Sequence, residues 1–515
     1  MRFRRTIGPF GLLFAGIGSI IGSGWLFGPL YAAQIAGPAA VLSWIIGGLL
    51  MLIIAFTFAE LGSAFPIAGG MVQYAQLSHG PLVSFMTGWM IWVSSIAVAP
   101  VETMGTIQYM SNYVPGLVTK VENQTVLTHI GIFFGAVIML VMCLLNYQGA
   151  KFFSQSNSII TALKLIVPIT TCVLLLGLHF HSENFYMAES GGFAPYGLQG
   201  ILAALPLGGV VYSFIGSNTV LQLAGETKNP QRDIPIALIS SIVFCIILNV
   251  FLQIAFIGAL DASSIKHGWK ALHYAGDSGP FAGILSAFGL AWFVIILYGD
   301  ALISPFGTGY VYTASTARIN YGLSRIGFFP KFLAKLTKKG VPTHGLIFNY
   351  FMGLFLFLPF PGWKDMVGFI ISCFIVSYII GPIALIELRK SHPEKSRPFK
   401  LPFPNFFALL AFYACNLLVY WTGWHTVYRM MIAMGIGFVF FVVYCYRQKN
   451  NIWLKQWHTS WWIIPYIIGM CCVSYLGTFG GGIGKMAFGL DFGIVAAFTV
   501  IVFYLAIKLS HPTTD

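Results

Sequence analysis

The sequence has 515 residues, of which 57% are hydrophobic and only 8% are Asp, Glu, Lys or Arg. A soluble domain carries roughly 25% charged residues, so this composition excludes a soluble enzyme, a disordered chain and a fibrous protein. Apolar residues run along the whole length. The composition therefore predicts an all-α polytopic membrane protein rather than a soluble domain on a single anchor.

The formal net charge is +13, which alone would suggest a nucleic-acid partner. The basic residues, however, lie in short connectors between apolar segments, where they set membrane orientation. We therefore expect no nucleic-acid partner. The eight cysteines show no disulfide or metal spacing, and no nucleophile–base pattern is visible, so no cofactor, metal or enzymatic activity is predicted.

Fourteen apolar segments are long enough to cross a bilayer as helices, because a helix satisfies its own backbone hydrogen bonds in lipid. They are predicted over residues 8–35, 38–62, 81–112, 128–148, 156–180, 198–222, 235–259, 284–312, 343–360, 366–387, 405–423, 427–446, 460–478 and 487–509.

The basic residues predict the orientation of these helices. With the N-terminus inside, 21 of the 28 lysines and arginines fall in cytoplasmic connectors and six fall outside, while Lys164 lies within a helix. This asymmetry is typical of the positive-inside rule. The sequence therefore predicts an integral multi-pass protein of the cell membrane with both termini in the cytoplasm, and no arginine is expected inside a helix.

Two similar motifs interrupt the first and sixth predicted helices near their middles. They are Ile21-Gly22-Ser23-Gly24 and Ile215-Gly216-Ser217-Asn218, and five helices separate them, so the second copy would have inverted topology. One Gly-Ser motif could merely allow close helix packing. Paired interruptions at matching positions are typical of a transporter binding site.

Four further stretches carry recognisable motifs. They are residues 16–25 (Gly-Ile-Gly-Ser-Ile-Ile-Gly-Ser-Gly-Trp), Ala59-Glu-Leu with Pro66 and Gly69-Gly70, residues 225–235 (Gly-Glu-Thr-Lys-Asn-Pro-Gln-Arg-Asp-Ile-Pro), and Arg318-Ile-Asn-Tyr-Gly322 with Gly327 and Pro330. Together they resemble the motifs of the amino acid–polyamine–organocation superfamily of permeases. The similarity covers roughly residues 8–390. Asp300 with Ser304-Pro305-Phe-Gly-Thr-Gly309 resembles a subgroup that includes proton-coupled aspartate permeases.

The resemblance implies the leucine-transporter fold, with helices 1–5 and 6–10 as inverted repeats, discontinuous helices 1 and 6, and about four further helices. The predicted divisions are a cytoplasmic N-terminus (1–7), a transporter core (8–390), a cytoplasmic loop (391–404), accessory C-terminal helices (405–509) and a cytoplasmic tail (510–515). The accessory helices carry no motif. We expect them to contact lipid or a second copy of the chain in a homodimer.

The interrupted helices predict a site for a zwitterionic α-amino acid. Free N–H groups at Gly22, Ser23 and Gly24 can bind a carboxylate at the positive end of the following half-helix. Free carbonyls around Ile20 and Phe214 can accept an ammonium. The resemblance implies the same roles at these positions.

Four further residues of helix 6 complete the predicted substrate site: Tyr212, Ser213, Gly216 and Asn218. Tyr212 matches the family position of an aromatic gate, although a core aromatic would explain it equally well in a chain with 16% aromatic residues. Asn218 stands where some arginine-exchanging relatives carry Glu, which argues against a cationic substrate.

Three ionisable residues, Glu102, Lys164 and Asp300, lie deep in apolar helices, where a charge is costly and usually functional. Some proton-coupled relatives carry a lysine at the position of Lys164. Burial disfavours the charged form of a lysine, so Lys164 can load and release a proton near neutral pH. Glu102 and Asp300 could carry the proton, pair with Lys164, bind a substrate ammonium or be structural. Glu60 is expected to make a structural contact or part of an inner gate.

The sequence thus predicts a secondary amino acid transporter, with an amino acid and a proton as its small-molecule partners and the lipid bilayer as its surroundings. Proton-coupled symport by alternating access is the leading hypothesis. An amino acid or amine exchanger without proton coupling is the alternative. A membrane amino acid sensor is disfavoured because the longest connectors, about 20 residues, are too short for a signalling domain.

Overall fold

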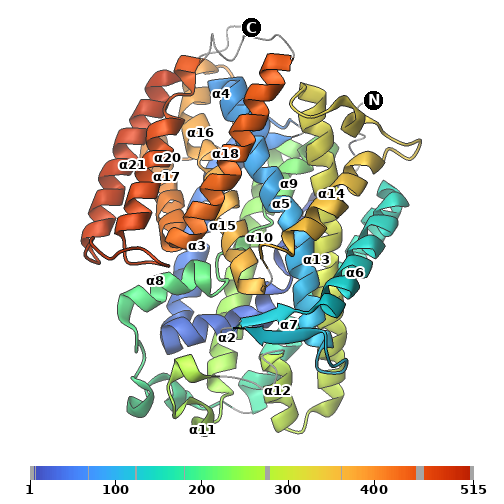
Figure 1. The fold of residues 1–515 in the computed structure, drawn as a ribbon, viewed down its shortest axis with the longest axis vertical. Helices are drawn as coiled ribbons and strands as arrows, with labels where there is room; N and C mark the ends of the chain where they lie inside the picture. The colour runs from blue at the N-terminus through green and yellow to red at the C-terminus, as the bar shows by residue number, and fades with distance from the viewer. Residues whose placement is uncertain are drawn as a thin grey trace.

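The computed structural model describes residues 5, 7–67, 69–121, 124–178, 180–272, 279–360, 362–447 and 457–510. Most of the predicted N-terminus (1–7) and tail (510–515) lies outside these residues. The described chain is almost entirely helical (Figure 1). Its one sheet within these residues is a hairpin of β1 (Val118–Val121) and β2 (Gln124–Leu127), antiparallel with Val118 opposite Leu127.

The helices follow the apolar segments of the sequence. Those of the first half are α1 (Pro9–Ile20), α2 (Gly24–Ala36), α3 (Ala40–Ala64), α4 (Gly70–His79), α5 (Pro81–Met110), α6 (His129–Tyr147), α7 (Ala150–Leu178), α8 (Gly197–Leu207), α9 (Thr219–Gln222) and α10 (Pro230–Gly258). Those of the second half are α11 (Ala262–Ile265), α12 (Pro280–Ala287), α13 (Ala291–Ile326), α14 (Thr343–Leu356), α15 (Trp363–Tyr378), α16 (Ile380–Ser391), α17 (Pro404–Trp421), α18 (Trp424–Arg447), α20 (Ile463–Leu476) and α21 (Leu490–Leu509).

Short 3-10 turns join several of these helices. They are η1 (Gly37–Ala39), η2 (Ser182–Phe185), η3 (Ala188–Ser190), η4 (Tyr212–Phe214), η5 (Ala224–Glu226), η6 (Trp269–Ala271), η7 (Lys331–Ala334) and η8 (Trp457–Thr459).

The number of membrane-spanning helices differs from the predicted fourteen. Within the described residues, eleven helices are long and apolar enough to cross a membrane, or twelve if the bent pair Gly197–Leu207 and Tyr212–Gln222 is one span. Each of the fourteen predicted segments contains a helix. The count falls because Gly24–Ala64 forms one helical stretch, and because α1 and α14, with 12 and 14 residues, are shorter than a full span.

The centre of the molecule is built from α5 and α13, which pack against each other along their length, and from α3 packed on α10. The C-terminal helices α17, α18, α20 and α21 gather on one side of this centre, coloured orange to red in Figure 1. Among them, α17 packs on α3 and α16, and α18 packs on α5 and α15. The accessory helices are therefore attached to the core and extend it.

One end of the molecule carries a concentration of basic residues. It includes α4, the loop around Glu226, the end of α13 with Arg318 and Arg325, and the segment 389–401; we call it the basic end. At this end the backbone of Ile7 bonds to the loop, its N–H donating to the Glu226 carbonyl at 2.9 Å. Figure 1 shows α4 at this end and α11 and α12 at the opposite end.

His79 joins α4 to the C-terminal helices at the basic end. Its side chain is fully buried, and Nε2 lies 3.1 Å from the carbonyl oxygen of Ala506 in α21. Burial lowers the pKa of His79 to about 4. This histidine is therefore neutral at physiological pH and serves as a structural contact rather than a pH sensor.

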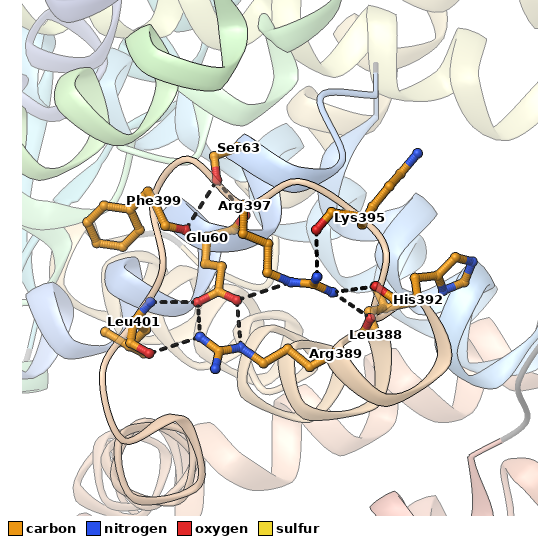
Figure 2. A network of polar contacts seen from close by, with 9 residues as sticks. All are labelled: Glu60, Ser63, Leu388, Arg389, His392, Lys395, Arg397, Phe399 and Leu401. Atoms are coloured by element: carbon orange, nitrogen blue, oxygen red, sulfur yellow. Dashed lines mark hydrogen bonds and ion pairs between the residues drawn. The ribbon is translucent and has the colours of Figure 1, made fainter.

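Glu60 in α3 holds the basic end of α16 through a buried ion network (Figure 2). Its carboxylate accepts two hydrogen bonds from Arg389, at 2.6 and 2.5 Å, and a third from the Leu401 amide at 2.7 Å. Nε of Arg397 lies 3.5 Å from the same carboxylate, while Nη2 donates to the carbonyls of Leu388 and His392. Glu60 thus connects three segments, and its predicted structural role is the one that this geometry supports.

Replacing Glu60 by Gln should destabilise the protein by about 3 kcal/mol, because two half-buried guanidinium groups lose their buried counter-ion. The measurement is the thermal unfolding midpoint of the purified variant in detergent. The matched control is Glu387→Gln in α16, where the native carboxylate accepts a hydrogen bond from Ser510. This variant should lose about 1 kcal/mol of its free energy of unfolding. Equal midpoints for the two variants would contradict the proposed role of the Glu60 network.

Candidate functional site

The first helix is broken in the middle of its predicted span. The half-helix α1 ends at Ile20 and α2 begins at Gly24, with Ile21 in an extended conformation (φ −80°, ψ 105°) between them. The residues of the break, Ile21 to Ser23, are buried. The last carbonyls of α1 and the first amides of α2 therefore lack helical partners inside the protein and need other ones.

The sixth helix is broken as well. α8 ends at Leu207, and the axis bends by 57° before η4 and α9 continue. Gly209 and Gly216 have φ angles of +74° and +126°, which L-amino acids rarely adopt. The two Ile-Gly-Ser motifs thus lie at real interruptions of their helices.

The two breaks touch each other. A Cβ placed on Gly216 would lie 2.5 Å from the carbonyl oxygen of Ser19 and 2.9 Å from the backbone nitrogen of Ile20. The hydroxyls of Ser19 and Thr219 share a hydrogen bond of 2.8 Å, and Gly24 lies directly against the Ser213 hydroxyl. The structure therefore brings together backbone of Ile20 and Gly24 from helix 1 with Ser213 and Gly216 from helix 6.

The side-chain ammonium of Lys164, a residue of α7, lies at the C-terminal end of α1. Its ammonium donates to the carbonyl of Gly18 at 2.7 Å and to Oγ1 of Thr308 in α13 at 2.6 Å. Thr308 in turn donates to the Ile21 carbonyl at 2.8 Å. A positive charge is favoured at the negative end of a helix dipole. Lys164, which is 1% exposed, thus joins α7, α1 and α13 at one point.

The side-chain carboxylate of Glu102, a residue of α5, lies at the N-terminal end of α2. Its Oε2 accepts the backbone N–H of Ser23 at 2.7 Å, and its Oε1 accepts the hydroxyl of Tyr212 at 2.6 Å. The carboxylate also lies against Gly22, since a Cβ on that residue would be 2.8 Å from Oε2. A carboxylate of the protein therefore binds an amide that the sequence assigned to the substrate carboxylate.

Trp363, at the start of α15, completes the site and was missed by the sequence reasoning. Its indole N–H donates to Oγ of Ser23 at 2.9 Å, and its ring meets Tyr212 edge-on with centroids 5.9 Å apart. Phe27 and Tyr31 pack on the same ring, at 5.4 and 5.6 Å. One of 13 tryptophans in an apolar sequence carries no signal that distinguishes it.

Asp300 lies in α13, two four-residue steps before Thr308. Within the described chain neither of its carboxylate oxygens has a hydrogen-bond partner, although the residue is buried. Asp300, Ser304 and Thr308 repeat at intervals of four, so they share one face of the helix with steps of about 6 Å. Thr308 is the member of this row that contacts Lys164 directly.

Two predicted site residues point away from the breaks. The ring of Phe214 packs edge-on against Trp44 of α3, with centroids 6.0 Å apart. Asn218 lines a separate cavity of about 10 Å³ with Leu238 and Tyr378, and both polar atoms of its side chain lack a partner in the described structure. The backbone of Phe214 remains at the break even though its side chain does not.

A cavity of about 330 Å³ leads from the basic end towards the breaks and reaches Ser19 and Thr219. Arg318 and Arg325 also line it, and Arg318 lies 4.0 Å from Glu226. The expectation that no arginine lies within a helix was wrong. α13 continues to Ile326, beyond the predicted end of that span at residue 312. The prediction ended too early because the last turns of this helix are polar and hydropathy does not detect them.

Comparison with known proteins gives matches along nearly the whole sequence. A family model described as amino acid permease matches residues 7–441. The chain is 39% identical to the glutamate/serine transporter AimA of Bacillus subtilis, over 99% of this chain and 95% of that protein. It is 35% identical to the aspartate–proton symporter of Bacillus subtilis (98% and 96%) and 26% identical to the branched-chain amino acid permease BcaP of the same organism (87% and 94%).

Replacing Gly216 by Ala should destabilise the protein by about 1–3 kcal/mol, because the new methyl group would strain the backbone and press on Ser19. Gly177 in α7 is the matched control, since a Cβ there meets nothing within 4 Å. Gly177→Ala should leave the thermal unfolding midpoint nearly unchanged. If Gly216→Ala unfolds at the same temperature as the control, the two breaks are not in the described contact.

Proposed function

The chain belongs to the amino acid permease family, and from this premise we propose that it is a proton-coupled symporter of a zwitterionic α-amino acid. As a member of this family it is an integral multi-pass membrane protein that transports amino acids and is not an enzyme. We further propose alternating access on two inverted repeats of five helices, with the basic end in the cytoplasm.

The two breaks support the proposed substrate class. The amide end of α2 can bind a carboxylate, and the carbonyl end of α1 can accept an ammonium. Only three residues lie between these two ends in the sequence, so one small zwitterion such as an α-amino acid can reach both. The names of two of these relatives make glutamate, serine and aspartate the first candidates. Arg318 and Arg325 would attract an anionic side chain into the cavity.

The single observation that carries proton coupling is the placement of Lys164. Its ammonium binds the buried Gly18 carbonyl near the end of α1, so it fixes this half-helix to α7 and α13. Loss of the proton would leave a neutral amine that no longer pairs with the helix dipole. Protonation of Lys164 would therefore control whether α1 can move, which is what alternating access requires of an inner gate.

The accessible side of the site fits this cycle. The cavity of about 330 Å³ opens at the basic end, whereas Trp363, Tyr31 and Phe27 pack over Ser23 on the other side. In the proposed orientation this is a conformation closed to the outside and open towards the cytoplasm. The Ser19–Thr219 hydrogen bond then lies between the cavity and the substrate site.

Replacing Lys164 by Ala should abolish proton-driven accumulation of substrate while sparing exchange of substrate for substrate, because exchange does not require the proton to be released. Uptake of radiolabelled glutamate, aspartate and serine into proteoliposomes, with and without a pH gradient, measures both modes. Lys266→Ala, in an exposed loop, is the control and should behave as the wild type. Undiminished pH-driven uptake by Lys164→Ala would contradict the proposed coupling.

A thermal-shift screen should identify the substrate and its pH dependence together. A ligand that binds only the folded protein raises the unfolding midpoint by mass action. We expect glutamate, aspartate or serine to raise it, and to raise it more at acidic than at neutral pH. Shifts of equal size at both pH values would favour an amino acid exchanger without proton coupling.

A further inference from the structure

We propose that Glu102 is a built-in substitute for the substrate carboxylate: it binds the Ser23 amide when the site is empty and takes up a proton when the substrate displaces it. This inference rests on the proposed function and adds Glu102, beside Lys164, as a second binding site for the same transported proton. Displacement of Glu102 from the Ser23 amide would link substrate binding to protonation, and both would occur at the break in helix 1.

The geometry places the two carboxylates in competition. Oε2 of Glu102 holds the Ser23 N–H at 2.7 Å, at the positive end of α2, where the substrate carboxylate is expected. The same carboxylate fills the space over Gly22. One N–H cannot donate to two carboxylates in the same position. A substrate carboxylate that reaches the Ser23 amide must therefore displace Glu102 from it.

The charges then determine what happens to Glu102. Two carboxylates held side by side in a buried site cannot both stay ionised. The substrate carboxylate has the helix end as its partner, whereas the displaced Glu102 has lost that partner. Glu102 is therefore the group that takes the proton.

The surroundings of Glu102 suit both of its forms. It is 1% exposed, and the groups facing it are the amide and hydroxyl of Ser23, the Tyr212 hydroxyl from η4, the Lys164 ammonium from α7 and the Tyr312 hydroxyl from α13. Lys164 is the only one of these groups that carries a formal charge. The Tyr212 hydroxyl donates to the carboxylate and, after rotation, can accept the O–H of the protonated acid.

The proton balance is simple. A hydronium ion on the side where the substrate enters transfers its proton to Glu102, so one O–H bond forms on the carboxylate, one O–H bond of the hydronium breaks, and water is left. When the substrate leaves on the opposite side, the Ser23 amide is free again, Glu102 returns to it, and the proton passes to water there. One proton thus accompanies each substrate carboxylate.

The test counts protons taken up on binding. Titration calorimetry of the purified full-length protein in two buffers of different ionisation enthalpy gives this number for L-glutamate, L-aspartate and L-serine in turn. Wild-type protein should take up about one proton per ligand bound, so that affinity changes about tenfold per pH unit. Glu102→Gln should still bind the ligand, with no proton uptake and no such pH dependence.

The contrary results are distinct. Equal proton uptake by Glu102→Gln and wild type would overturn the role of Glu102 and leave proton-coupled transport standing. Failure of all three amino acids to bind wild-type protein would overturn the proposed function and this inference with it. Glu387→Gln, a buried carboxylate on α16 away from the site, is the matched control and should behave as wild type.

A second variant keeps the test independent of whether Glu102→Gln folds. Tyr212→Phe removes the hydroxyl that donates to Oε1 but retains the Glu102 carboxylate. It should still take up about one proton per ligand, and the pH range over which affinity changes should shift from that of the wild type. An unshifted range would contradict the contact between Tyr212 and Glu102 as part of proton binding.

Discussion

The structure depends on how the backbone groups exposed at two broken helices are satisfied inside a membrane. Breaking helix 1 between Ile20 and Gly24 leaves carbonyls at one end and amides at the other, with no water or lipid group to bond them. The protein supplies an ammonium for the carbonyl end, from Lys164, and a carboxylate for the amide end, from Glu102. Each is the charge that the helix dipole favours at that end.

The arrangement resembles a bound zwitterion distributed over two helices. Because each charge is stabilised mainly by the break, a substrate that binds there changes the partners of both. In the proposed function, proton coupling follows from competition for backbone groups, without a dedicated proton channel. Thr308 and Tyr212 link the two charges to α13 and to helix 6. A change at either charge would thereby reach the elements that move relative to one another in the proposed alternating access.

Much of this could be predicted from the sequence, because the signals are local. Composition predicted a helical membrane protein, the two Ile-Gly-Ser motifs predicted the breaks, and the family resemblance is confirmed by the match over residues 7–441. The depth of Lys164 indicated a charge that needs partners. Two contacts of Ser23 have no local signal, because they depend on packing between helices. One is with Glu102, 79 residues away, and the other is with Trp363, 340 residues away. Arg318 was misplaced because hydropathy does not detect polar helical turns.

The most direct test of this account is the number of charges that cross the membrane with each amino acid. The reversal potential of wild-type protein in proteoliposomes reports this ratio for serine, and the dependence of uptake on membrane potential reports it for glutamate and aspartate. Competition between substrate and Glu102 predicts one proton per molecule, hence one net positive charge for serine and none for the monoanions of glutamate and aspartate. A reversal potential that does not respond to the pH gradient would contradict the account.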